Sequence, residues 1–133
     1  MCRTRTGGLL LAIAAVLALA GCGDGDGGVS FAEPQDGATV ASPVRAVMES
    51  EEVEIVEAGE PREGTGHFHI MVDAGCVEPG EIIPEDDQHL HFGDASTETT
   101  ISLAPGEHSL CLQVGDGAHT ALDDTDEITV TAE

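Results

Sequence analysis

Alternation of apolar and polar residues over short segments is the feature that most restricts the fold of this chain. In "ETTISLAPGEHSLCLQV", residues 98–114, apolar side chains recur at every second position on either side of "APGE", the period of a strand with one face in a core. Similar segments are separated by turn sequences such as "PQDG", "VEPGE" and "GDGAH". No helical period is found beyond residue 22. We therefore expect an all-β protein, a small immunoglobulin-like antiparallel β-sandwich.

The segments predicted to form strands are short and either alternate or are rich in β-branched residues. They are Val29–Ala32, Val44–Met48, Val53–Val56, His67–Val72, Glu98–Leu103, Glu107–Val114 and Glu127–Thr131.

Residues 98–114 are predicted to form a hairpin, because Pro105 fixes φ and Gly106 tolerates a turn conformation. Alternation assigns one set of side chains to the core and the other to solvent. The core set is Ile101, Leu103, Leu110, Leu112 and Val114, and the solvent set is Thr100, Ser102, Ser109 and Cys111.

The first 22 residues have the features of an export signal. Arg3 and Arg5 precede an apolar run, Leu9–Leu19, that is too short to span a bilayer as a stable helix. The run ends in "LAGC", which resembles a bacterial lipobox and predicts lipidation of Cys22; an ordinary secretory signal is the alternative. We expect a signal peptide at 1–22, a flexible tether at 23–28 and one domain at 29–133.

This organisation predicts an exported protein held by its lipid on the outer face of the cytoplasmic membrane or on another envelope membrane. Beyond the signal, Arg45 and Arg62 are the basic residues that accompany the 26 acidic ones. Such a charge excludes nucleic acid as a partner, because phosphate would be repelled. Another protein of the envelope remains a possible partner.

Two cysteines, Cys76 and Cys111, remain once Cys2 and Cys22 are assigned to the signal and the anchor. In an exported domain with a small core, a disulfide between them is the default expectation. Closing a loop of this size stabilises the fold by about 4 kcal/mol in the chain-entropy model. A free or metal-binding pair is the alternative, although two thiols without a third make a poor zinc site.

Two His-x-His pairs lie in strand-like sequence. In "HFHIMV" the apolar Phe68 and Ile70 must face the core, so that His67 and His69 share the opposite face with Met71. The same alternation places His89 and His91 on one face of "HLHF". Residues two apart on a strand are separated by about 6.6 Å, so both imidazoles can reach one ion.

If the two segments are neighbours, their four imidazoles can converge on a metal ion. His119 is a further candidate ligand, and Asp73 and Glu98 are candidates for an outer shell. Imidazole nitrogen suits copper and zinc, so these are the candidate metals. Structural histidines that bond to backbone or water, and a pH sensor among carboxylates, are the alternatives. The acidic segments "PEDDQ" and "ALDDTDE" lack the ligand spacing of a calcium loop.

Several separated motifs resemble a bacterial envelope family catalogued as domain of unknown function 4399. They are "FAEPQDGATVASPV", "GTGHFHIMVD", "IPEDDQHLHFGDASTETTISLAPGEHSLCLQVGDGAH" and "DEITV". The resemblance implies a small exported β-sandwich, often a lipoprotein, and brings no established activity. The family commonly has histidine where this chain has Phe68, which fits a core position for Phe68. It often has further histidine and proline after Asp116, where this chain departs from the pattern around His119.

Known catalytic patterns fit poorly. A cupin-like metal enzyme also uses His-x-His, but no glutamate follows His69 at the required spacing. The chain has no Gly-x-Ser-x-Gly elbow and no lysine. These patterns leave acid–base chemistry by a carboxylate pair open but favour a protein that is not an enzyme, with a histidine-based copper or zinc site. An envelope interaction module with structural histidines is the alternative from another class.

Overall fold

The computed structural model describes residues 28–133, which form strands and no helix. The strands are β1 (Val29–Glu33), β2 (Thr39–Val40), β3 (Val44–Ser50), β4 (Glu54–Ile55), β5 (Thr65–Val72), β6 (His89–His91), β7 (Glu98–Ile101), β8 (Gly106–Gly115) and β9 (Ala121–Ala132). The all-β prediction is confirmed. Among these residues no helix is long and apolar enough to cross a membrane. The predicted signal peptide, Cys22 and the tether up to residue 27 lie outside the described residues.

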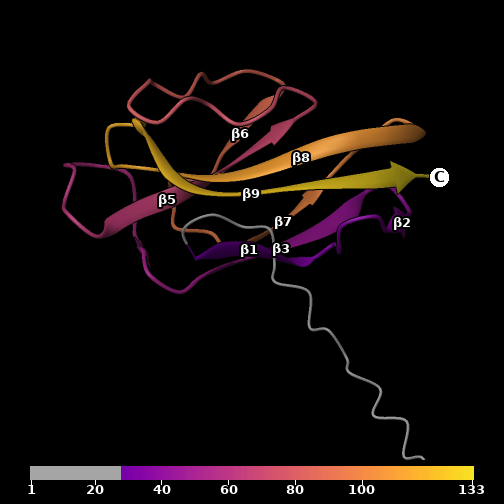
Figure 1. Cartoon of the computed structure of the whole chain (residues 1–133), viewed down its shortest axis with the longest axis horizontal. Coiled ribbons are helices and arrows are strands. Elements are labelled where there is room, and N and C mark those ends of the chain that lie inside the picture. The colour runs from indigo at the N-terminus through magenta and orange to yellow at the C-terminus, as the bar shows by residue number, and fades with distance from the viewer. Residues whose placement is uncertain (1–27) are drawn as a thin grey trace, which may run out of the picture.

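The strands form two sheets (Figure 1). The smaller sheet has the order β1-β3-β7, and all of its pairs are antiparallel. The larger sheet has the order β2-β9-β8-β5-β4, and β6 also pairs with β5. Its central ladders, β5–β8 and β8–β9, are antiparallel, whereas the short pairs β2–β9 and β4–β5 are parallel. β5 is thus held by β8 on one edge and by β4 and β6 on the other.

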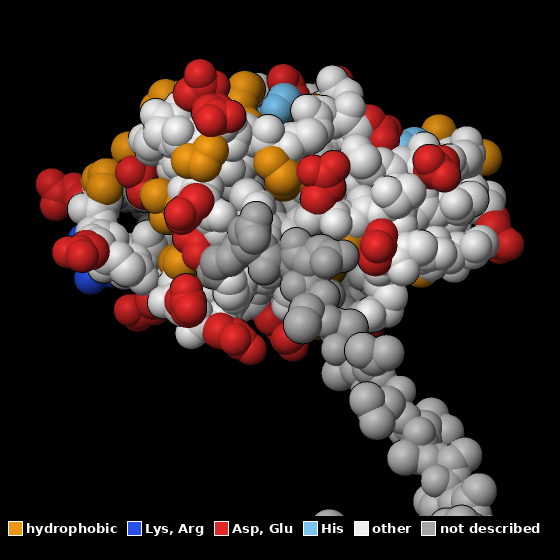
Figure 2. Space-filling view, in the orientation of Figure 1, with side chains coloured by type: hydrophobic (Ala, Val, Ile, Leu, Met, Phe, Trp, Pro, Cys, Tyr) orange, Lys and Arg blue, Asp and Glu red, His pale blue; other side chains and the backbone are white. Residues whose placement is uncertain are grey.

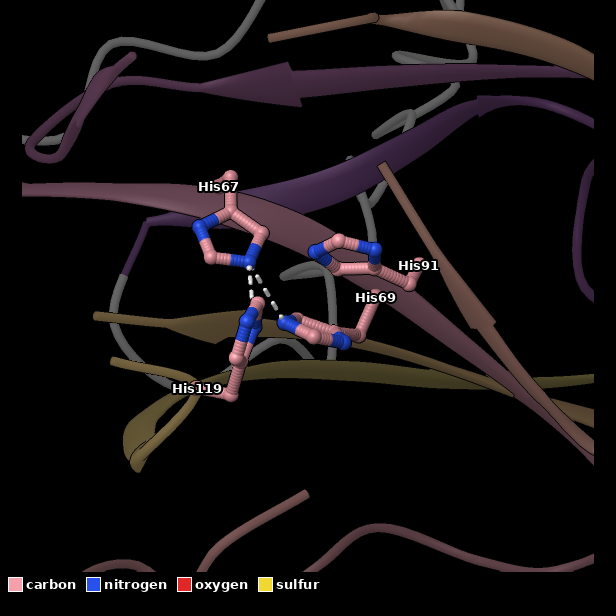
Figure 3. Close-up of side chains that lie close together, drawn as sticks. All are labelled: His67, His69, His91 and His119. Atoms are coloured by element: carbon pink, nitrogen blue, oxygen red, sulfur yellow. Dashed lines mark hydrogen bonds between the residues drawn. The ribbon is translucent and has the colours of Figure 1, made fainter. Parts of the chain in front are cut away.

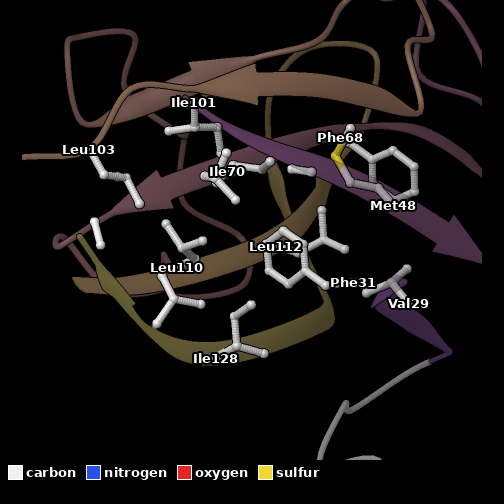
Figure 4. Packing of buried hydrophobic residues seen from close by; sticks show 14 of the residues in the cluster. Val29, Phe31, Met48, Phe68, Ile70, Ile101, Leu103, Leu110, Leu112 and Ile128 are labelled. Atoms are coloured by element: carbon white, nitrogen blue, oxygen red, sulfur yellow. The ribbon is translucent and has the colours of Figure 1, made fainter. Parts of the chain in front are cut away.

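One hydrophobic core takes side chains from both sheets (Figure 4). Burying a side chain such as Phe68 or Ile70 is worth about 1.5–3 kcal/mol. The residues predicted to face inward are all buried, which confirms their assignment: Ile101, Leu103, Leu110, Leu112 and Val114. Cys111 faces away from this core as predicted but is covered as well, with 1% of its surface exposed.

The predicted hairpin at 98–114 is wrong. β7 pairs with β3 in the smaller sheet, while β8 pairs with β5 and β9 in the larger one, so "APGE" connects the two sheets. Gly106 does have a positive φ of 128°. Two strands with one apolar face each can pair edge to edge or pack face to face. Alternation alone does not distinguish these arrangements.

β9 begins at Ala121, well before the predicted start at Glu127. Its acidic first half is strand because it pairs with β8, and Asp124 and Asp126 are buried there. Asp126 accepts the N–H of Phe31 on β1 at 2.9 Å. This hydrogen bond joins the two sheets at the edge of the core. Burial, with Asp123 and Glu52 nearby, raises the pKa of the neighbouring Asp124.

The segment between β5 and β6 covers the face of the larger sheet that points away from the core (Figure 1). The predicted disulfide, Cys76–Cys111, fastens this segment to β8. Gln113, two residues further along β8, accepts the N–H of Val77 and donates to its carbonyl, both at 2.8 Å. A second cluster of buried residues forms between the sheet and this segment, which supplies Ile83; the other members are Met71, Cys111 and Ala121.

Candidate metal centre

β5 supplies two histidines to the covered face of the larger sheet. Phe68 and Ile70 point into the core, so His67 and His69 point to the opposite side, as alternation predicts. Both histidines have 0% of their surface exposed. The sequence predicted the direction of these side chains but not that other chain segments would bury them.

β6 supplies a third histidine through its antiparallel register with β5. His91 lies opposite His69, and His89 lies opposite Met71, one row away. His89 instead contacts Asp86, whose Oδ1 is 2.6 Å from the Nδ1 of His89. The structure therefore brings His91 to the cluster and leaves the predicted ligand His89 outside it.

The fourth histidine, His119, comes from the turn between β8 and β9. Asp116 holds this turn, because its Oδ1 accepts the N–H groups of Ala118 and Thr120 at 2.9 and 3.0 Å. His119 has a positive φ of 66°, a conformation that is uncommon for residues with a side chain. The turn thus directs an imidazole over the face of β5. The sequence suggested His119 as a ligand, although the family pattern supported it least.

The four imidazoles of His67, His69, His91 and His119 surround one point (Figure 3). The Nε2 of His67 is 3.0 Å from the Nε2 of His69 and 3.1 Å from the Nδ1 of His119. One ligand atom from each of the four residues lies within 4.8 Å of the other three. A tetrahedral site with bonds of 2.0–2.1 Å has ligand nitrogens about 3.3 Å apart, so small movements suffice to bind an ion.

Two imidazoles of the cluster, those of His67 and His69, are kept neutral by their surroundings. Burial, and then the nearby histidines, lowers the pKa of His69 to about 3. The pKa of His67 is lowered to about 4, again first by burial and then by His91 and His119. Neutral imidazole carries the free lone pair that a metal ion needs. Both side chains therefore stay available as ligands well below neutral pH.

Hydrogen bonding within the cluster is incomplete. A ring nitrogen has one hydrogen or one lone pair, so the Nε2 of His67 cannot bond fully to both of its neighbours. The Nε2 of His91 is buried and has no hydrogen-bond partner among the described residues, and the same holds for the Nδ1 atoms of His67 and His69. Buried polar atoms are normally paired. The ring nitrogens of the cluster therefore converge without forming a complete set of hydrogen bonds, and a bound cation would give their lone pairs a partner.

Two glycines make room for the rings. A Cβ on Gly115, which lies opposite His67 in the β5–β8 ladder, would be 2.8 Å from the Nε2 of His69. A Cβ on Gly93 would be 2.7 Å from the Nε2 of His91. Both distances are shorter than a real Cβ contact, so a residue with a side chain at Gly93 or Gly115 would force the histidine rings to move.

The predicted outer-shell residues lie elsewhere. Asp73 accepts from the N–H of Ser109 at 2.9 Å, and its other oxygen is 2.6 Å from the Nδ1 of His108. Glu98, on β7 of the smaller sheet, forms an ion pair with Arg45 at 2.8 Å. The carboxylate that does contact the cluster is Glu85, 3.2 Å from the Nδ1 of His91. Nothing in the sequence distinguishes Glu85 from its acidic neighbours.

The family model described as Domain of unknown function (DUF4399) matches residues 46–133. The chain belongs to this family. The match confirms the resemblance seen in the motifs, although it begins within β3 and so excludes the segment 31–44. No curated protein and no solved structure matches the chain.

All four clustered histidines of this DUF4399 domain lie within the matched range, as do Gly93, Gly115 and both cysteines of the disulfide. Chemically, the cluster offers up to four nitrogen ligands, and two of them, on His67 and His69, have no exposed surface. Among residues 28–133, no carboxylate belongs to this group of candidate ligands. Such a set suits copper(II) and zinc better than calcium or magnesium, which prefer oxygen.

Proposed function

We propose that this protein binds one copper(II) or zinc ion through the imidazoles of four histidines, His67, His69, His91 and His119. The observation that carries the proposal is the pair of contacts of 3.0 and 3.1 Å made by the Nε2 of His67, which a single ring nitrogen cannot satisfy by hydrogen bonds. Structural histidines, the alternative, would be expected to have their nitrogens paired.

The surface charge supports the same function. Carboxylates are spread over the face seen in Figure 2, and the whole chain has a net charge of −22. A negative potential raises the local concentration of cations and speeds their association. The acidic surface is therefore compatible with the capture of a metal cation.

Titration of the full-length protein with copper(II) and with zinc, each in competition with a chelator of known affinity, tests the proposal. We expect one ion per chain. Replacing His67 by alanine removes a ligand and should lower the affinity by more than the roughly 10–100-fold that loss of an outer-shell partner costs. His119→Ala, which changes a turn rather than the buried strand, should do the same.

His89→Ala is the matched control, because it removes an imidazole on the same face without touching the cluster. It should bind as tightly as the unchanged protein. Equal affinity in His67→Ala, His119→Ala and His89→Ala, or no binding by the unchanged protein, would refute the metal site. An envelope interaction module with structural histidines would then be the better explanation.

We also propose that the domain is an immunoglobulin-like β-sandwich on an exported lipoprotein. Two sheets that share one core support the sandwich, and "LAGC" supports lipidation of Cys22. Mass spectrometry of the protein isolated from bacterial membranes should find an acylated Cys22 at the N-terminus. The variant Cys22→Ser should leave the membrane fraction. An unmodified chain, or a variant that stays on the membrane, would refute the anchor.

A further inference from the structure

The four histidines of the cluster differ in how firmly they are held. His67, His69 and His119 are linked by nitrogen contacts of 3.0 and 3.1 Å, whereas neither nitrogen of His91 hydrogen-bonds to another ring. His67 and His69 lie on β5, which is paired on both edges. His91 lies on the three-residue strand β6, which pairs only with β5. Its side chain is 27% exposed, so it forms the solvent side of the cluster.

Glu85 is the carboxylate that lies against the ring of His91. Its Oε1 lies 3.2 Å from the Nδ1 of His91, while the Nε2 of His91 faces the other rings without a partner. A carboxylate on one nitrogen of a ligand histidine fixes the ring so that the other nitrogen faces the metal. The side chain of Glu85 is 63% exposed. The contact is therefore at the surface, where an approaching molecule can reach it.

We propose that His91 is the exchangeable ligand of the site, positioned by Glu85, and that an ion held by the other three histidines is passed to an external nitrogen or oxygen ligand at the His91 position. This inference rests on the proposed metal site. In the exchange, the bond between the metal and the Nε2 of His91 breaks and a bond to the incoming donor forms. No electron is transferred, and the imidazole of His91 turns outward with its Nδ1 still on Glu85.

Three histidines with a replaceable fourth ligand are a known working arrangement for zinc, because three protein nitrogens hold the ion while the fourth position stays open to exchange. In this protein the buried side of the cluster would determine affinity, and the exposed side would determine the rate of release. The incoming ligand belongs to a class that includes imidazole, carboxylate and water.

The test measures zinc binding and zinc release to excess chelator for the full-length protein and its variants. His91→Ala should keep one zinc per chain and release it at least about tenfold faster, whereas His67→Ala should not retain the ion. With cobalt(II) in place of zinc, added imidazole should change the visible spectrum of His91→Ala by occupying the vacant position.

Glu85→Gln should also speed release without changing the stoichiometry. Asp87→Asn is its matched control, since it removes an exposed acidic group from the same segment, two residues after Glu85. Thermal unfolding of the metal-free variants should be unchanged, which separates positioning from a structural role.

If His91→Ala loses zinc as completely as His67→Ala, or if Glu85→Gln releases zinc no faster than Asp87→Asn, the inference is overturned while the metal site stands. If the unchanged protein binds no ion, the metal site itself fails and the inference fails with it.

Discussion

The Nε2 atoms of His67 and His69 lie 3.0 Å apart on the buried outer face of β5. Neighbouring positions on one face of a strand are about 6.6 Å apart, so the two rings lean toward each other and toward a common point. Because the two rings converge on a buried face rather than on an open surface, burial and the neighbouring imidazoles lower the pKa of both.

Acid should destabilise the metal-free protein through His69. Its pKa in the folded state is about 3, below the ordinary value of 6.5, so the unfolded chain takes up a proton first as the pH falls. The stabilising effect of keeping this ring neutral is complete above about pH 6.5 and is lost progressively as the pH falls toward 3. Urea unfolding in the presence of a chelator at pH 7, 5.5 and 4 measures this loss.

His69→Leu is the comparison for this experiment, because it removes the titrating ring but leaves every carboxylate in place. As the pH is lowered, the unfolding free energy of the unchanged protein should fall by more than that of the variant. A difference that does not change with pH would show that the imidazole is not kept neutral by folding.

Alanine at Gly115 should disrupt the cluster. The added Cβ would lie 2.8 Å from the Nε2 of His69 and 3.2 Å from the Cδ1 of Ile83, so the ring must move. Forcing an extra methyl into a packed site costs about 1–3 kcal/mol. We expect lower stability and weaker metal binding, measured by thermal unfolding and competitive titration. Gly59→Ala, where an added Cβ meets open space, should change neither.

Removal of the disulfide should reduce stability substantially. Cys76 and Cys111 are 35 residues apart in sequence, for which the chain-entropy model gives about 4 kcal/mol. The double variant Cys76→Ala, Cys111→Ala should lose stability of this order in urea unfolding. A reducing agent should produce a similar loss in the unchanged protein and none in the double variant. Equal stability of oxidised and reduced protein would contradict this prediction.

His108 should titrate above the ordinary histidine range. The contact of its Nδ1 with Asp73, and then the contact of its Nε2 with the carbonyl of Ala104, raises its pKa, because both ring nitrogens face acceptors. Its contribution to stability is therefore complete below about pH 6.5 and is lost as the pH rises through the raised value. NMR titration of the ring protons should show this elevation.

Asp73→Asn should return the pKa of His108 toward 6.5, whereas Asp86→Asn, which removes the partner of His89 instead, should leave His108 unchanged. A His108 that titrates normally in the unchanged protein would show that the contact with Asp73 does not persist in solution.

The alternation of apolar and polar residues correctly predicted which face of a strand a side chain occupies, because that face depends only on the strand itself. Because side chains alternate between faces, Phe68 and Ile70 had to enter the core and His67 and His69 had to face away. Strand positions followed from the same pattern for most of the chain. The acidic start of β9 was missed, since its buried carboxylates hide the alternation; the structure accounts for Asp126 by its hydrogen bond from the N–H of Phe31.

The sequence by itself determined the all-β class, the faces on which the residues of β5 and β8 lie, the cysteine pair and the family. The tertiary structure alone decided that β7 and β8 belong to different sheets, that His91 rather than His89 faces His69, and that His119 and Glu85 reach the cluster. The physical reason is the distance along the chain between the residues that interact. The face of a side chain depends on the pleat of its own strand, whereas register and loop position depend on contacts between segments far apart in the chain.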